Sequence, residues 1–227
     1  YYFNLFLEDS RPPGWLVDDI SIAASNLTTG TVRVTNNLSQ AGFTLTGPTS
    51  RTGQGWNVTF TNVPTGTYRV SFDPVPYYLT PVPQTNILVG RGNLVFHGFY
   101  GFADVNTNGM SDVWEQAQFG VVSPTRDATT DTDHDGFPDV AEFVAGTDPK
   151  TATSKFEAAL PRKLDDGSVQ VAWATVAGRT YRVLASTNAV NWQVVADWQR
   201  ATVGHLTVTL LPAMIGSCGW FRLEVKP

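Results

Sequence analysis

The chain has 227 residues, of which 42% are hydrophobic and 15% are charged, a composition sufficient for folded cores. It is rich in Thr, Gly, Pro, Val and aromatic residues, which favour short strands and turns over long helices. A single cysteine, Cys218, excludes disulfides within the chain and is expected to be a buried thiol. We therefore expect a mainly β fold that is stabilised by packing or by another kind of clamp.

The net charge of −5 is unevenly distributed along the chain. Residues 104–148 contain ten of the twenty acidic side chains and one basic side chain, Arg126. No cluster of Lys and Arg with interleaved aromatic residues occurs, which argues against nucleic acid as a partner. No apolar run approaches the roughly 18 residues of a membrane span, and the first residues do not resemble a signal peptide. The first residue is Tyr1, which suggests a processed product or a part of a longer protein.

Residues 1–25 read as a β-hairpin, with strands at 1–8 and 15–22 joined by the turn-prone DSRPPG. The phrase GWLVDDISI resembles the last strand of jelly-roll, lectin-like modules of secreted bacterial proteins. The resemblance implies an incomplete jelly-roll module. Two strands are not a stable domain, so the hairpin is expected to pack on a neighbouring domain or on another copy of the chain.

Residues 26–103 alternate between apolar and polar side chains in six short stretches bounded by Gly, Pro or Asn. This spacing predicts a small antiparallel β-sandwich. The stretch FTNVPTGTYRVSFD, with Pro64, Gly66 and Tyr68 at its turn, is similar to prealbumin-like and PEGA modules of bacterial surface proteins. That resemblance implies an immunoglobulin-like or prealbumin-like spacer or docking domain, and it brings no catalytic residue.

Residues 104–150 contain two loops with the same spacing of oxygen-bearing side chains and the same central glycine, which we name loop 1 (104–115) and loop 2 (131–142). The expected ligands of loop 1 are Asp104, Asn106, Asn108, the carbonyl of Met110, Asp112 and Glu115. Those of loop 2 are Asp131, Asp133, Asp135, the carbonyl of Phe137, Asp139 and Glu142. Both loops match the EF-hand spacing over twelve residues, so we expect two Ca²⁺ sites.

Whether the loops bind an ion, and which ion, has several possible answers. Two solvated acidic turns would explain the composition, but five like charges in loop 2 would repel one another without a counterion. Mg²⁺ prefers a stricter octahedron, whereas a bidentate glutamate favours the larger Ca²⁺. Zinc is disfavoured because His134, the one histidine in the loops, is expected to face outward.

A short helix is expected after each loop, at 112–119 and 138–145, each ending before a glycine. Loop 1 is preceded by a strand pattern, and Pro138 removes an N–H that paired EF-hands use, so a calmodulin-like sensor is excluded. The duplicated loop-helix units resemble dockerins and thrombospondin type 3 calcium repeats. The positions that bind cohesin in dockerins are apolar and differ between the repeats, which favours a structural role; they are Val113, Trp114, Val140 and Ala141.

Residues 151–227 return to a β pattern and predict a second small sandwich, which resembles the C-terminal modules of large secreted bacterial proteins in the stretch AGRTYRVLASTNAVNWQVV. Trp192, Trp198 and Trp220 are expected either to pack in its core or to form a platform on which sugars stack. The sequence contains no metalloprotease, nucleophile-elbow or phosphate-loop motif, so a non-enzymatic chain is expected.

These features predict an extracellular or cell-surface region in which calcium rigidifies the segment between two sandwiches, as a structural or adhesive part of a modular protein. With calcium at about ten times Kd, each site would add roughly 1.4 kcal/mol to the stability of the folded state. The alternative is the accessory tail of a secreted hydrolase, whose last sandwich binds polysaccharide.

Overall fold

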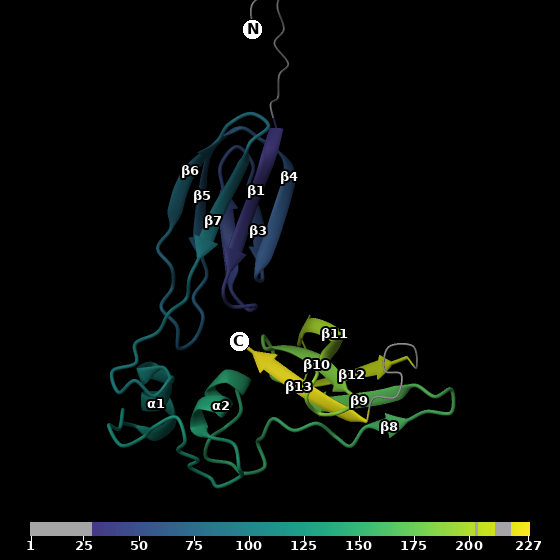
Figure 1. The fold of residues 1–227 in the computed structure, drawn as a ribbon. Coiled ribbons are helices and arrows are strands. Elements are labelled where there is room, and N and C mark those ends of the chain that lie inside the picture. Colours follow the sequence, from purple (N-terminus) through teal and green to yellow (C-terminus); the bar gives the residue numbers. More distant parts are fainter. Residues whose placement is uncertain (1–28, 203, 212–218) are drawn as a thin grey trace, which may run out of the picture.

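The computed structural model describes residues 29–202, 204–211 and 219–227. The predicted hairpin at 1–25 and Cys218 lie outside the described residues. The described chain is mainly β, with two groups of strands and two short helices (Figure 1). None of its helices combines the length and the apolar character that a membrane crossing requires.

The first sandwich is built from two sheets with strand orders β4-β1-β7 and β3-β2-β5-β6. Its strands are β1 (Thr29–Asn36), β2 (Gly42–Thr46), β3 (Arg51–Gln54), β4 (Asn57–Pro64), β5 (Gly66–Phe72), β6 (Gln84–Leu88) and β7 (Asn93–Gly98). Alternate residues of a strand face opposite sides, so Val32 and Val34 meet Phe43, Leu45 and Val70 in a single core. Strand β3 lies in a polar stretch where no strand was expected.

One strand pairing differs from the predicted antiparallel sandwich. Strand β7 pairs with β1 in parallel, from Thr31 opposite Asn93 to Asn36 opposite Gly98. Residues 89–92 carry the chain from β6 in one sheet to β7 in the other, so β7 does not return beside β6 as a hairpin would. Side-chain alternation reveals which face of a strand is buried and carries no information on strand direction, which is why the prediction was wrong here.

The second sandwich also consists of two sheets, with strand orders β11-β10-β13 and β12-β9-β8. Its strands are β8 (Arg162–Lys163), β9 (Val169–Ala174), β10 (Thr180–Ser186), β11 (Gln193–Arg200), β12 (His205–Leu210) and β13 (Trp220–Lys226). All described pairings in it are antiparallel. Trp173, Tyr181 and Val183 lie at the centre of its core, where Trp173 is 2% exposed.

The two helices lie in the segment between the sandwiches (Figure 1). Helix α1 spans Asp112–Phe119 and α2 spans Asp139–Ala145, and each ends at a glycine in the left-handed conformation, Gly120 and Gly146. Pro138 was expected inside α2. It precedes the helix instead, because its ψ of 148° is extended.

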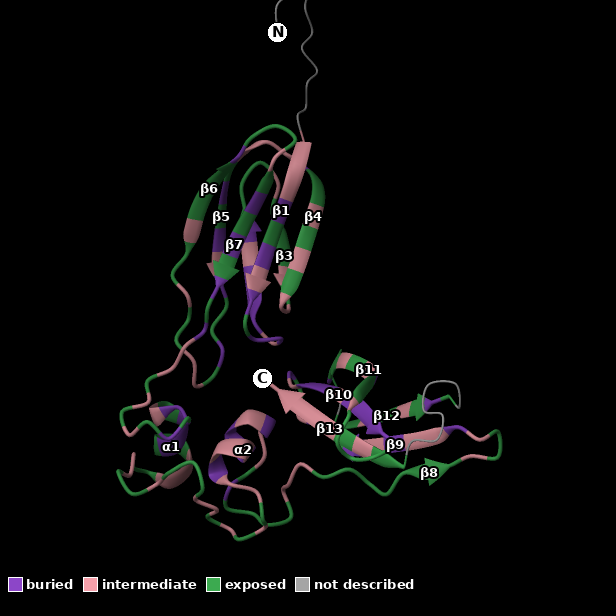
Figure 2. Ribbon diagram, viewed as in Figure 1, coloured by how far each residue is buried: buried purple, intermediate pink, exposed green. Residues whose placement is uncertain are grey.

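The helical segment packs against the first sandwich through aromatic side chains. Phe143 of α2 is 2% exposed, and its ring centroid lies 5.9 Å from Tyr78, 5.4 Å from Phe102 and 5.3 Å from Trp114. Tyr78 and Phe102 lie in loops at the end of the first sandwich, and Trp114 belongs to α1. The buried stretches of both helices are visible in Figure 2. This cluster joins the two helices to each other and to the first sandwich.

The second sandwich contacts both other parts. Arg179 donates hydrogen bonds to the carbonyl of Phe143 at 3.0 Å and to Gln40 Oε1 at 3.3 Å, and Ser39 Oγ donates to the carbonyl of Gly178 at 2.7 Å. Gly146 permits the close approach of Arg179, since a Cβ there would lie 3.1 Å from Nε. The three parts therefore meet at one junction, which the helical segment helps to form.

The Phe143 cluster should account for a large share of the stability of the junction. We predict that Phe143→Ala lowers the free energy of unfolding by about 3–5 kcal/mol, the usual cost of removing a buried ring. Val113→Ala is the matched control, because Val113 lies on α1 and is 60% exposed. Urea unfolding followed by tryptophan fluorescence measures both. A loss at Phe143 no larger than that at Val113 would show that the cluster is not an important contact.

Candidate metal centre

The two loops have the same backbone conformation. Their fourth residues, Thr107 and His134, both have a positive φ, 57° and 61°, and their sixth residues, Gly109 and Gly136, have φ of 86° and 94°. Left-handed conformations are uncommon for residues other than glycine. Their recurrence at matching positions shows that the spacing in the sequence reflects a duplicated structure.

The same hydrogen bonds hold each loop closed. The carboxylates of Asp104 and Asp131 accept from the N–H of Gly109 and Gly136, both at 2.9 Å. At the other end, the N–H groups of Asp112 and Asp139 donate to the carbonyls of residues 103 and 130 at 2.8 and 2.7 Å. These bonds curl each loop around its centre, which is the geometry that an oxygen-lined cation site requires.

Loop 2 brings together carboxylates, several of whose oxygens accept no hydrogen bond. Single oxygens of Asp131, Asp133 and Asp135 lie within 4.8 Å of one another. Asp133 Oδ2, Asp135 Oδ2 and Glu142 Oε2 are buried and have no hydrogen-bond partner among the described residues. Buried charged oxygens without a partner are costly unless they are paired or bind a metal. The residues present therefore fit a hard divalent cation.

Glu142 is the most buried of the carboxylates without a full set of partners in loop 2, with 1% of its surface exposed. Burial is the main cause that raises the pKa of its carboxyl to about 7; a hydrogen bond from Thr147 opposes the rise, and the charges of Asp133, Asp135 and Asp139 add to it. The Thr147 hydroxyl donates to Oε1 at 3.0 Å and leaves Oε2 free. Among the described residues, no cation pairs with Glu142, and the positive charge that reaches loop 2 is on Arg126, beside Asp139.

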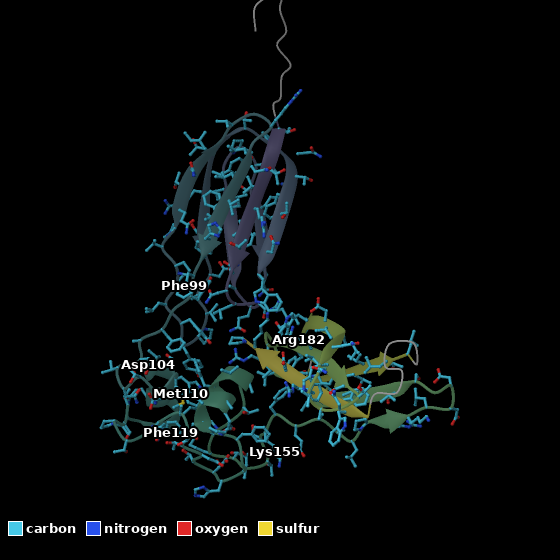
Figure 3. All side chains as sticks on the ribbon, in the orientation of Figure 1. Phe99, Asp104, Met110, Phe119, Lys155 and Arg182 are labelled. Atoms are coloured by element: carbon cyan, nitrogen blue, oxygen red, sulfur yellow. The ribbon has the colours of Figure 1, made fainter. Side chains whose placement is uncertain are left out.

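Loop 1 has the same shape and a different chemistry. Asn106 Nδ2 donates to Glu115 Oε2 at 3.1 Å and to the carbonyl of Ser123 at 2.9 Å, and Asn108 Nδ2 donates to the carbonyl of Arg126 at 3.2 Å. Two amides thus replace two of the carboxylates of loop 2 and supply donors. The acidic residues of loop 1 are only Asp104, Asp112 and Glu115. Figure 3 labels Asp104 and Met110 in this loop.

The ninth residue of each loop has a structural partner. Asp112 Oδ1 accepts from the N–H of Val105 at 3.1 Å, and Asp139 Oδ1 accepts from the N–H of Thr132 at 2.9 Å. Asp139 Oδ2 also accepts from the Thr132 hydroxyl at 2.7 Å. The structure thus brings Asp131, Asp133 and Asp135 together, whereas Asp112 and Asp139 brace the starts of their own loops.

The sequence analysis did not assign a role to Arg126, which lies between the two loops in space. Its Nη1 is 3.2 Å from Glu115 Oε1 of loop 1, and its Nε is 3.2 Å from Asp139 Oδ2 of loop 2. Both carboxylates are fully buried, and the guanidinium also lies over the ring of Phe119, 3.6 Å from its centroid. The one signal in the sequence was that Arg126 is the single basic residue in a strongly acidic segment.

The other candidate residues form no comparable site. Trp192 and Trp198 each have a cation over the ring: Arg222 lies 4.1 Å from the centroid of Trp192, and Lys226 lies 3.9 Å from that of Trp198. Trp198 also contacts Trp56 of the first sandwich, with the centroids 6.0 Å apart. Trp220 is 56% exposed. These three side chains therefore do not present one open aromatic platform.

Comparisons with known proteins give no family for this chain. No protein-family model matches it, and no curated protein matches it by sequence. Among solved structures, the chain is similar to DUF3823 family proteins from Bacteroides ovatus and Parabacteroides merdae, both with a TM-score of 0.26 and with 10% and 9% identity, over 87% of this chain and 88% of each of those chains. A "putative carbohydrate binding protein" from Bacteroides uniformis matches with a TM-score of 0.22 and 10% identity, over 82% of this chain and 80% of that chain. Similarity at this level carries no functional argument, so function is argued from the residues.

Arg126 should stabilise the junction by pairing with carboxylates of both loops. We predict that Arg126→Gln lowers the free energy of unfolding by about 3 kcal/mol in a calcium chelator, because it leaves Glu115 and Asp139 buried without a counterion. Arg162→Gln is the control, since Arg162 is exposed on β8. Chemical unfolding of the two variants tests the prediction, and equal stabilities would show that Arg126 does not link the loops energetically.

Proposed function

We propose that this chain is a calcium-stabilised structural region of an extracellular modular protein, in which the helical segment fixes the two sandwiches relative to each other. The observation that carries the proposal is the set of buried oxygens in loop 2 that have no partner, on Asp133, Asp135 and Glu142. The region acts by holding a shape, and its function requires no catalytic group.

The donor chemistry favours Ca²⁺. Loop 2 offers carboxylates, together with the Phe137 carbonyl expected from its spacing, and Ca²⁺ takes six to eight oxygens at about 2.3–2.6 Å. Within the described residues, the group of acidic, His or Cys side chains that could hold a metal contains only aspartates. An oxygen-only set disfavours zinc, which prefers nitrogen and sulfur ligands.

The two loops should differ in affinity. Loop 2 carries five acidic residues and loop 1 carries three, and Glu115 of loop 1 is already paired with Arg126. Affinity in loops of this kind rises with the number of charged ligands. We therefore assign the stronger site to loop 2 and the weaker site to loop 1.

Calcium in loop 2 would act on the junction through α2. Glu142, a ligand of the proposed site, is followed directly by Phe143, which packs against the first sandwich and accepts a hydrogen bond from Arg179 of the second. A cation that fixes Glu142 therefore fixes the helix that both sandwiches contact. This geometry supports a rigid joint over an isolated acidic turn.

Removing calcium should loosen the junction. We predict that a chelator lowers the melting temperature by about 3–10 °C, which corresponds to one or two sites held at about ten times Kd. Limited proteolysis should then show new cleavage between Phe102 and Phe156. If the melting curve and the digestion pattern are the same in chelator and in millimolar calcium, the proposed function is wrong.

A single substitution distinguishes the effect of calcium binding on stability from the stability of the calcium-free fold. Asp135→Asn gives loop 2 the residue that loop 1 has at that position, and its Oδ1 can still accept from the N–H of Phe137, as Asn108 accepts from Met110 at 2.9 Å. We predict that the variant is at least as stable as the wild type in chelator, because it removes a repelling charge. It should gain far less stability from calcium.

The matched control is Asp197→Asn, because Asp197 is exposed and also accepts from a backbone N–H, that of Trp198 at 2.7 Å. It should respond to calcium as the wild type does. Differential scanning calorimetry of both variants, each with and without calcium, gives the four melting temperatures to compare. A calcium response of Asp135→Asn equal to that of the control would remove loop 2 as the site.

The second candidate function is the accessory carbohydrate-binding tail of a secreted hydrolase. The exposure of Trp220 favours it, since an open indole can stack on a sugar ring. A polysaccharide pull-down compared between the wild type and Trp220→Ala distinguishes the two functions. Binding that is lost in the variant and unaffected by chelator would favour the second.

A further inference from the structure

A cleft of about 460 Å³ lies at the junction where the first sandwich, the helical segment and the second sandwich meet. The first sandwich contributes Gln40 and Tyr77 to its walls, and the second sandwich contributes Arg179 and Arg200. Gln118, near the C-terminal end of α1, also lines it. The volume is within the range of about 300–1,000 Å³ that is usual for small-ligand sites. Because all three parts contribute, the cleft exists only when the junction is formed.

The charge of this cleft is opposite to that of the protein. Its lining includes two arginines and no acidic residue, whereas the whole chain has a net charge of −5. Lys150 lies close by, and its Nζ donates to the carbonyl of Gln118 at 2.7 Å. The cleft is therefore a positive site on an acidic protein, and a negatively charged ligand fits it.

Arg179 has no carboxylate partner in the part of the chain that the structure describes. Its guanidinium bonds to the carbonyl of Phe143 and to Gln40, and its Nε is buried without a partner. Within residues 29–202, 204–211 and 219–227, none of the ion pairs involves Arg179. Burial without a compensating negative charge lowers its pKa. A cation withdrawn from water in this way is stabilised by an anion that binds nearby.

Tyr77 is held in a conformation that tyrosine rarely adopts, with φ of 72°. The hydroxyl of Ser111, the residue before α1, donates to the Tyr77 carbonyl at 2.8 Å and fixes this turn. Strained backbone of this kind concentrates at functional sites. No hydrogen bond joins the Tyr77 hydroxyl to another of the described residues, which leaves it available to a ligand.

The remaining polar side chains of the cleft are three neutral groups and a second arginine. Gln40, Gln118 and Thr147 offer amides and a hydroxyl, which pair with hydroxyl groups, and Arg200 offers a guanidinium that can bind a carboxylate with two parallel hydrogen bonds. We propose that the junction cleft binds an acidic sugar, a residue that carries several hydroxyl groups and one carboxylate or sulfate. In this proposal the sugar contacts neither Trp220 nor a calcium ion.

The test is isothermal titration calorimetry in millimolar calcium with three matched probes: a galacturonic acid trisaccharide, a sulfated galactose trisaccharide and the neutral galactose trisaccharide. We expect at least one acidic probe to bind more tightly than the neutral one, and the tighter of the two identifies the anion. Arg200→Gln should weaken that binding about tenfold, because it removes a charge-assisted hydrogen bond. Arg162→Gln, an exposed arginine of the same sandwich, should not change it.

The Arg200 side chain is exposed, and its 2.6 Å hydrogen bond to Gln54 Oε1 of the first sandwich is one of several contacts across the junction, so the remaining contacts should keep the junction folded in Arg200→Gln. An unchanged melting temperature of the variant checks this. The proposal is overturned if the neutral probe binds as tightly as both acidic probes, if none binds, or if Arg200→Gln binds like the wild type. Binding that survives Arg200→Gln and is lost in Asp135→Asn would instead show that the sugar is held by calcium in loop 2, and it too overturns the proposal. The melting response to chelator is measured separately, so failure here does not affect the calcium proposal.

Discussion

Helix α2 buries Phe143 among aromatic side chains of the first sandwich and of α1, and the arrangement of the whole region depends on this contact. The preceding residue, Glu142, is equally buried and closes loop 2. Two adjacent residues of one short helix thus contribute to the acidic loop and to the junction. Since a seven-residue helix is marginal by itself, its position is set by these tertiary contacts.

The two loops share a backbone shape and differ in charge. In loop 1 two neutral amides stand where loop 2 has carboxylates, and one of them, Asn106, donates a hydrogen bond to Glu115. Glu115 also shares Arg126 with Asp139 of loop 2. Loop 2 concentrates five acidic residues and keeps three buried oxygens without donors. Buried oxygens of this kind cost free energy without a partner, and the proposed cation would reduce that cost. The junction therefore has a negatively charged region, the loops, and a separate positively charged region, the cleft with its two arginines.

The parts that could be predicted from the sequence are those that local rules determine. The loops and both helices follow from the spacing of the oxygen-bearing side chains and from glycines at left-handed positions, within one residue at Pro138. The parallel β1–β7 pairing and the position of Arg126 between the loops depend on contacts between segments far apart in the chain. Trp198 likewise gave no signal that it packs against Trp56 of the other sandwich. One sequence carries no record of such distant contacts.

The central claim is that loop 2 holds a calcium ion that fixes α2 at the junction. The most direct measurement is a crystal structure of the protein grown in millimolar calcium. The account predicts an ion in loop 2 with six to eight oxygens at about 2.3–2.6 Å, including oxygens of Asp133, Asp135 and Glu142. A well-ordered loop 2 that contains only water, with these carboxylates turned away from one another, would contradict it.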